Sequence, residues 1–108
     1  MAKILVVEDE KSVRENIIEV LSSQNYECLN ASNGIEALNI LEKNHVDLIV
    51  SDIMMPKMDG FTLYQKIVNE QHYWQIPFIF LTAKSDEISV REGMKLGADD
   101  YIKKPFHI

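Results

Sequence analysis

Carboxylates, a hydroxyl and two lysines follow short apolar runs at four places in the chain. They are Glu8, Asp9 and Glu10 after the first run, Asp52 and Thr82 after two later runs, and Lys103 and Lys104 at the last. Two carboxylates about 4 Å apart repel each other by about 4 kcal/mol at an effective dielectric constant near 20, so a cluster is costly unless a cation joins it. Oxygen ligands with no His or Cys nearby select a hard ion such as Mg²⁺ or Mn²⁺. If the ends of these runs meet in space, we therefore expect a metal site.

The same residues could also carry out phosphoryl transfer. A carboxylate such as Asp52 can attack phosphorus and form an aspartyl phosphate. Thr82 can donate a hydrogen bond to a phosphoryl oxygen, and Lys104 can supply a positive charge. Phosphoryl transfer requires mainly positioning and charge neutralisation. Each feature is weak evidence by itself, because an acidic loop is usually just solvated and a single Asp after a strand is often a helix cap.

The elements that must position these residues alternate between short apolar runs and segments of helical periodicity, a pattern typical of a parallel α/β sheet with right-handed crossovers. We predict strands over residues 4–7, about 27–31, 48–51, 78–81 and about 100–103. The first predicted helix has Ser12 and Glu15 as a capping box and buries Val13, Ile17, Val20 and Leu21. A second predicted helix begins at the cap Asn33 and buries Ala37, Leu38 and Leu41. A third begins at the cap Asp59 and buries Leu63, Tyr64, Ile67 and Val68. A fourth is expected over about 86–96.

Length and composition limit the possible classes of protein. A chain of 108 residues is expected to form one domain, and 46% hydrophobic with 26% charged residues is typical of a globular one. The net charge of −6 argues against sequence-independent binding to nucleic acid. The single cysteine, Cys28, is expected to be a buried thiol. No apolar run is long enough for a signal peptide or a membrane span, so the expected location is the cytoplasm.

Four motifs together resemble the receiver domain of two-component response regulators. They are VVEDE at 6–10, SDIMMPKMDG at 51–60, LTAK at 81–84 and DDYIKKPF at 99–106, and the resemblance extends from Lys3 to Pro105. It implies a flavodoxin-like, doubly wound sheet of five parallel strands in the order 2-1-3-4-5. In such sheets ligands bind beyond the carboxyl ends of the strands, where the strand order reverses.

The resemblance also implies a role for each site residue. Asp52 would be the phosphoacceptor, which receives a phosphoryl group from a histidine of a partner kinase. Mg²⁺ (or Mn²⁺) would be bound directly by Asp9, Asp52 and the backbone carbonyl of Met54, and through water by Glu8. Thr82 would be the switch hydroxyl, Lys104 the lysine that pairs with the phosphate, and Tyr101 the aromatic switch residue. The Lys104-Pro105 bond would be cis, as is usual in the family.

The chain would then be a signalling phosphoacceptor that assists its own phosphorylation and dephosphorylation, and not an enzyme in the usual sense. Expected partners are a sensor histidine kinase or phosphotransfer protein, an output domain C-terminal to this region, and a second copy of the chain, with no nucleic acid or membrane bound directly. Receiver domains normally end with a fifth helix, and residues 1–108 stop where that helix would begin. We therefore expect a truncated domain with weak stability or a tendency to dimerise.

Other classes fit the sequence less well. Aspartyl-phosphate hydrolases require a second Asp at the position of Met54, and mononucleotide binders require a neutral phosphate loop in place of Glu8-Asp9-Glu10. A degenerate receiver that serves only as an interaction module is the main alternative, although it should have lost one of Asp9, Asp52, Thr82 or Lys104. Met54, Met55 and Met58 are expected to pack in a loop, with a kinase-docking surface as the second interpretation. Trp74 is expected to be a packing residue.

Overall fold

The sheet has five parallel strands in the predicted order. A computed structural model of the chain describes residues 2–53, 55–82 and 100–103, and at 82 and 100–103 it describes the backbone alone. The strands are β1 (Lys3–Val7), β2 (Glu27–Ala31), β3 (Leu48–Asp52), β4 (Phe78–Thr82) and β5 (Asp100–Lys103). Their order is β2-β1-β3-β4-β5. The expected fold class is confirmed, and the helix expected over 86–96 lies outside the described residues.

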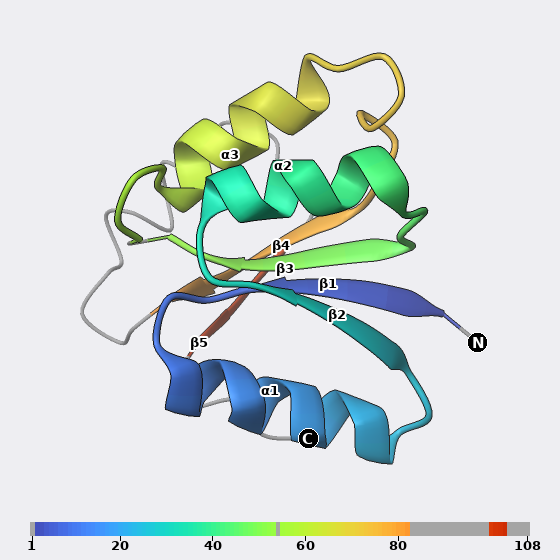
Figure 1. The fold of residues 1–108 in the computed structure, drawn as a ribbon, viewed down its shortest axis with the longest axis vertical. Coiled ribbons are helices and arrows are strands. Elements are labelled where there is room, and N and C mark those ends of the chain that lie inside the picture. The colour runs from blue at the N-terminus through green and yellow to red at the C-terminus, as the bar shows by residue number, and fades with distance from the viewer. Residues whose placement is uncertain (1, 54, 83–99, 104–108) are drawn as a thin grey trace.

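Three described helices cover the two faces of this sheet. They are α1 (Lys11–Ser23), α2 (Gly34–Lys43) and α3 (Gly60–Val68). Figure 1 shows α2 and α3 on one face and α1 on the other. Side chains of a strand alternate between the two faces, so a strand covered on both sides is apolar throughout. In β1, Leu5 and Val7 pack in the core under α2 and α3, whereas Ile4 and Val6 pack with α1.

Aromatic rings anchor α3 to the neighbouring strand β4. The rings of Phe61 and Phe80 lie 5.1 Å apart in an edge-to-face arrangement, and so do those of Tyr64 and Phe78. Such pairs each contribute about 0.5–1.5 kcal/mol beyond the burial of their area. They fix the position of α3, and therefore of the loop that leads into it from β3.

The starts of α2 and α3 are as predicted from the sequence, whereas the start of α1 is not. The side chains of Asn33 and Asp59 accept hydrogen bonds from backbone N–H groups at the starts of α2 and α3, at 2.9 and 2.8 Å. The capping box at Ser12 is wrong, because α1 already begins at Lys11 and Ser12 lies within its first turn. The N-cap is Glu10, whose side chain makes no capping hydrogen bond within the described part of the chain.

The surface departs from expectation at Trp74. This side chain is 55% exposed in the turns that connect α3 to β4, so its assignment as a packing residue is wrong. Met55 and Met58 are half-buried and pack against the main core, as expected of loop packing.

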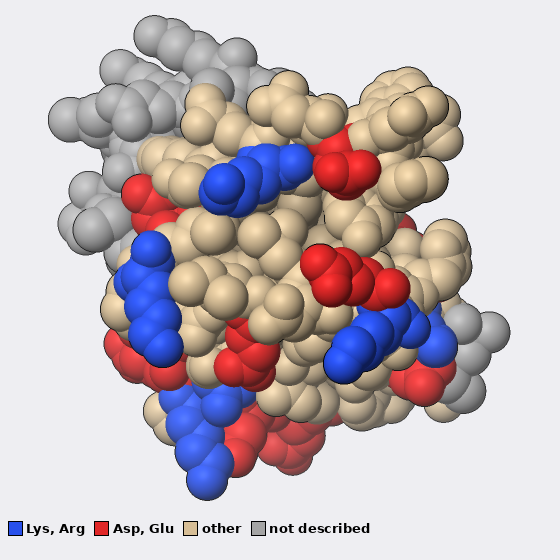
Figure 2. Space-filling view, turned by 45° about the horizontal axis from the view of Figure 1, so that its top comes forward, with Lys and Arg blue, Asp and Glu red and all other residues tan. Residues whose placement is uncertain are grey.

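On the face drawn in Figure 2, basic and acidic side chains are interspersed and form no large area of one sign. Among the described helices, none combines the length and the apolar character that crossing a membrane requires.

Candidate functional site

Three of the predicted carboxylates meet at the carboxyl edge of the sheet. Glu8 follows β1 and is fully buried, Asp52 is the last residue of β3 and is 7% exposed, and Asp9 is exposed. Each offers one oxygen, and these three oxygens all lie within 4.8 Å of one another. Such a set of oxygen donors, two of them on buried residues, fits a hard divalent cation and would be costly without one.

The central position of β3 holds Asp52 in place. Ser51 is paired with Val7 of β1, and Asp52 is paired with Leu81 of β4. The side chain of Ser51 also donates a hydrogen bond to the backbone carbonyl of Asp52 at 3.0 Å. The carboxylate therefore extends from a strand that has a neighbour on each side.

Gly60, the first residue of α3, allows the chain to return close to this strand. Its N–H donates to the carbonyl of Ile53 at 2.8 Å. A Cβ atom at Gly60 would collide with the backbone carbonyl oxygen of Asp52, which cannot give way as a flexible side chain could. Only glycine permits this approach without a shift of the backbone.

Hydrogen bonds from three directions fix the acidic loop after β1. The N–H of Glu8 donates to the carbonyl of Ala31 at 3.0 Å, which continues the pairing with β2. The N–H of Glu10 donates to a carboxylate oxygen of Glu8 at 3.4 Å. The guanidinium of Arg14, in the first turn of α1, donates to the carbonyl of Glu8 at 2.7 Å. The positive end of the α1 dipole also lies directly after this acidic loop.

Sequence reasoning missed Arg14. The signal that could have revealed it is a cation in the first turn of a helix, where the dipole disfavours positive charge. A half-buried cation in such a position points to a compensating interaction, and for Arg14 the partner is the carbonyl of Glu8.

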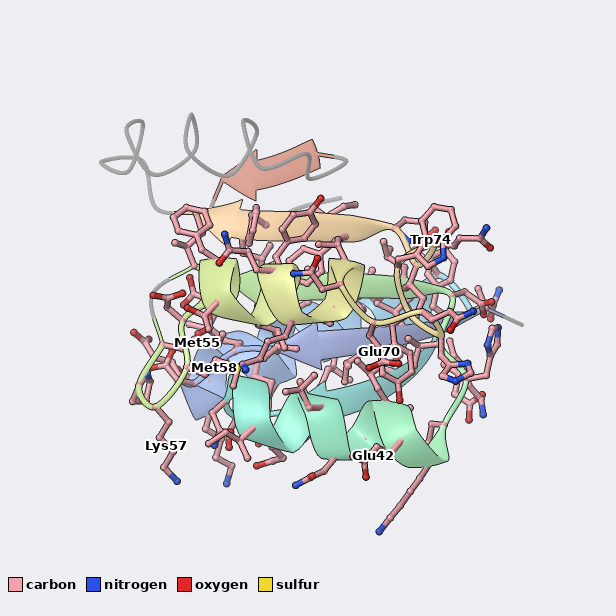
Figure 3. The ribbon with its side chains drawn as sticks, turned by 90° about the horizontal axis from the view of Figure 1, so that it is seen from above. Glu42, Met55, Lys57, Met58, Glu70 and Trp74 are labelled. Atoms are coloured by element: carbon pink, nitrogen blue, oxygen red, sulfur yellow. The ribbon has the colours of Figure 1, made fainter. Side chains whose placement is uncertain are left out.

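The loop between β3 and α3 turns sharply at Lys57. The N–H of Met58 donates to the carbonyl of Pro56 at 2.7 Å, and Lys57 has a φ of 67°. Figure 3 shows the side chain of Lys57 pointing away from the sheet. Met58 lies against the first residue of α2, Gly34, where an added Cβ would fall 2.8 Å from the Met58 sulfur. The loop after the candidate phosphoacceptor is thus packed against a second helix.

The other predicted site residues are only partly described. The backbone of Thr82 ends β4, one residue beyond the partner of Asp52, and pairs with Lys103 of β5. The backbone of Tyr101 pairs with Phe80. Met54, Lys104 and Pro105 lie outside the described residues, and so do the side chains of Thr82 and Tyr101. The roles expected for these residues stay predictions.

Comparison with known proteins identifies the family. The family profile described as the response regulator receiver domain matches residues 4–108. The chain belongs to this family. A structure of a putative response regulator from Chloroflexus aurantiacus superimposes on this receiver domain with a TM-score of 0.93, at 34% identity over 98% of this chain and 87% of that one. The receiver domain of a sensor histidine kinase from Pseudomonas aeruginosa, with a magnesium ion coordinated in its active-site cleft, has a TM-score of 0.89 at 29% identity, over 98% of this chain and 87% of that one.

The sequence is also similar to that of a longer protein. This receiver domain is 45% identical to a probable transcriptional regulator, ycf27, of Porphyridium aerugineum over 104 residues. The match covers 96% of this receiver domain and 42% of the regulator, so the chain spans about two fifths of the length of that relative.

Proposed function

We propose that this receiver domain accepts a phosphoryl group on Asp52, from a histidine of a sensor kinase or a phosphotransfer protein, with the help of Mg²⁺. The observation that carries the proposal is the cluster of Glu8, Asp9 and Asp52, whose oxygens lie within 4.8 Å of one another at the carboxyl edge of the sheet. Membership of the receiver family supports it, because proteins of two-component systems work in this way.

The chemistry follows from the position of Asp52. An oxygen of its carboxylate attacks phosphorus, an O–P bond forms, the P–N bond to the donor histidine breaks, and the imidazole nitrogen leaves with the electron pair and takes up a proton. Asp9 and Asp52 would hold the ion directly and Glu8 through water, with the carbonyl of Met54 as a further ligand. When bound, Mg²⁺ (or Mn²⁺) neutralises charge on the phosphoryl oxygens. The buried β3 strand keeps the attacking oxygen oriented.

The remaining predicted site residues would respond to phosphorylation of Asp52. Thr82 would donate a hydrogen bond to the new phosphoryl group and Lys104 would pair with its charge, while Tyr101 would turn inward as Thr82 moves. The chain is then a signalling phosphoacceptor that assists its own phosphorylation and dephosphorylation.

Its partners follow from the same proposal. They are the phosphodonor protein and, by analogy with the longer transcriptional regulator, an output domain on the C-terminal side. A homodimer, a cytoplasmic location and the absence of direct nucleic-acid or membrane binding stay predictions.

Incubation with Mg²⁺ and a small phosphodonor, followed by intact mass measurement and mapping of the modified residue, tests the assignment. We expect one added phosphoryl group on Asp52, none after chelation of the metal, and none in Asp52→Asn, since an amide oxygen is a poor nucleophile. Asp47→Asn is the matched control, because Asp47 is a half-exposed residue between α2 and β3 whose carboxylate is not in the cluster. Equal labelling of Asp52→Asn and wild type would refute the assignment. No labelling of the folded wild-type protein would favour a phosphorylation-independent interaction module.

A further inference from the structure

We propose that Arg14 is a positioning residue that holds the acidic loop in the shape required to bind a divalent cation. The proposal rests on the metal site of the proposed function. It adds to that site a residue that supports the ligands and does not itself bind the ion. Its basis is the contact between the Arg14 guanidinium and the backbone carbonyl of Glu8, at 2.7 Å.

This contact joins the metal-binding loop to the first turn of α1. The N-cap of α1 is Glu10, so Arg14 is the fourth residue of the helix and reaches back to the second residue before the cap. The carbonyl of Glu8 immediately precedes Asp9. A bond to it therefore restrains the peptide that connects the buried carboxylate of Glu8 to the exposed carboxylate of Asp9.

The two cations of this helical turn differ in their surroundings. Lys11 is 79% exposed and lies 3.8 Å from Glu15 on the surface of the same helix. Arg14 is half-buried and directed toward the loop. The first turn of α1 contains both cations and no acidic residue, although the dipole favours the reverse. The exposed pair contributes little, so Lys11 provides a cation in the same turn that does not hold the loop.

Two effects of Arg14 on cation binding oppose each other. Its positive charge repels the divalent ion. If the two charges are taken to be about 10 Å apart in water, the repulsion lowers the affinity about fourfold, and screening at 0.1 M ionic strength reduces this to about twofold. Its hydrogen bond keeps the ligands in position, and loss of a residue that supports metal ligands typically lowers affinity about 10- to 100-fold. The positioning effect therefore dominates, and removal of Arg14 weakens binding.

The test is the affinity for Mn²⁺ alone, measured by the electron paramagnetic resonance signal of the free ion at 0.1 M ionic strength. We compare wild type, Arg14→Gln, Arg14→Lys and the matched control Lys11→Gln. We expect Lys11→Gln to bind within about twofold of wild type, and Arg14→Gln to bind at least about tenfold more weakly. Arg14→Lys, which keeps the charge and one donor direction, should recover part of the loss.

The outcomes separate this inference from the function on which it rests. If wild type itself does not bind Mn²⁺, the proposed metal site is wrong. If wild type binds and Arg14→Gln matches Lys11→Gln or binds more tightly, the positioning role of Arg14 is wrong. Circular dichroism without metal establishes whether each variant is folded. If Arg14→Gln is not folded, the Mn²⁺ affinities of Arg14→Lys and Lys11→Gln are compared instead. Weaker binding by Arg14→Lys supports the positioning role of Arg14, and equal binding contradicts it.

Discussion

Two residues in the loops of the site are in unfavourable arrangements, one because of its burial and one because of its backbone conformation. Glu8 is a carboxylate with no exposed surface, and Lys57 is a non-glycine residue with a φ of 67°. The sequence predicts which carboxylates meet at the carboxyl edge of the sheet, because their types and their places after apolar runs are visible. The sequence shows Arg14 as a cation at the start of a helix, but the burial of Glu8 and the carbonyl that Arg14 contacts could not be predicted, since both depend on how closely the loop packs against α1.

The backbone of Lys57 leads to a prediction about stability. A non-glycine residue at positive φ costs about 1–3 kcal/mol, whereas the extra chain entropy of glycine costs about 0.5–1 kcal/mol. Lys57→Gly should therefore raise the free energy of unfolding, by up to about 2 kcal/mol, in urea denaturation. Lys66→Gly, in the last turn of α3, is the control and should lower it by about 1 kcal/mol. A loss of stability in both variants would mean that the Lys57 turn carries no strain.

The strands and helices were predictable because their apolar periodicity is strong and each face of the sheet is covered. Strand β3 extends one residue further than expected, to Asp52, because its pairing with Leu81 continues. The start of α1 was mistaken, since Ser12 and Glu15 have the spacing of a capping box while the acidic loop is short enough for the helix to begin at Lys11. The exposure of Trp74 follows from the turns after α3, which sequence periodicity does not indicate.

The end of α1 offers a test of a single helix terminus. Asn25 has a φ of 69° there, and the N–H groups of Asn25 and Tyr26 donate back to Ser22 and Leu21 at 3.0 and 3.3 Å. This pattern is a Schellman motif, in which glycine fits best. Asn25→Gly should raise the thermal midpoint, because glycine adopts a positive φ without steric cost, and Asn25→Val should lower it. Gln24→Gly, at a φ of −98°, is the control and should give no gain.

For the whole molecule, the acidic cluster should couple metal binding to stability. The chain carries a net charge of −6, and the folded state alone brings the three carboxylates together. At a Mg²⁺ concentration 100 times the dissociation constant, binding should stabilise the fold by about 2.7 kcal/mol.

The measurement is the thermal midpoint with Mg²⁺, with chelator, and with a monovalent salt of equal ionic strength. Asp9→Asn should lose most of the stabilisation, and the remote Asp47→Asn should keep it. An equal gain in all three proteins would indicate general charge screening and no specific site.

The central position of β3 also sets how the molecule exchanges its amide hydrogens. Backbone groups of a strand paired on both sides become accessible only in the rarest openings, whereas loops and helix ends open often. Amides of residues 49–51 should thus exchange most slowly, and those of the loop from 55 to 59 much faster. The residue that would carry the phosphoryl group then belongs to the last part of the sheet to open, and the loop that follows it belongs to the first. Phosphorylation of Asp52 would therefore change the exchange of this loop more than the protection of the strand.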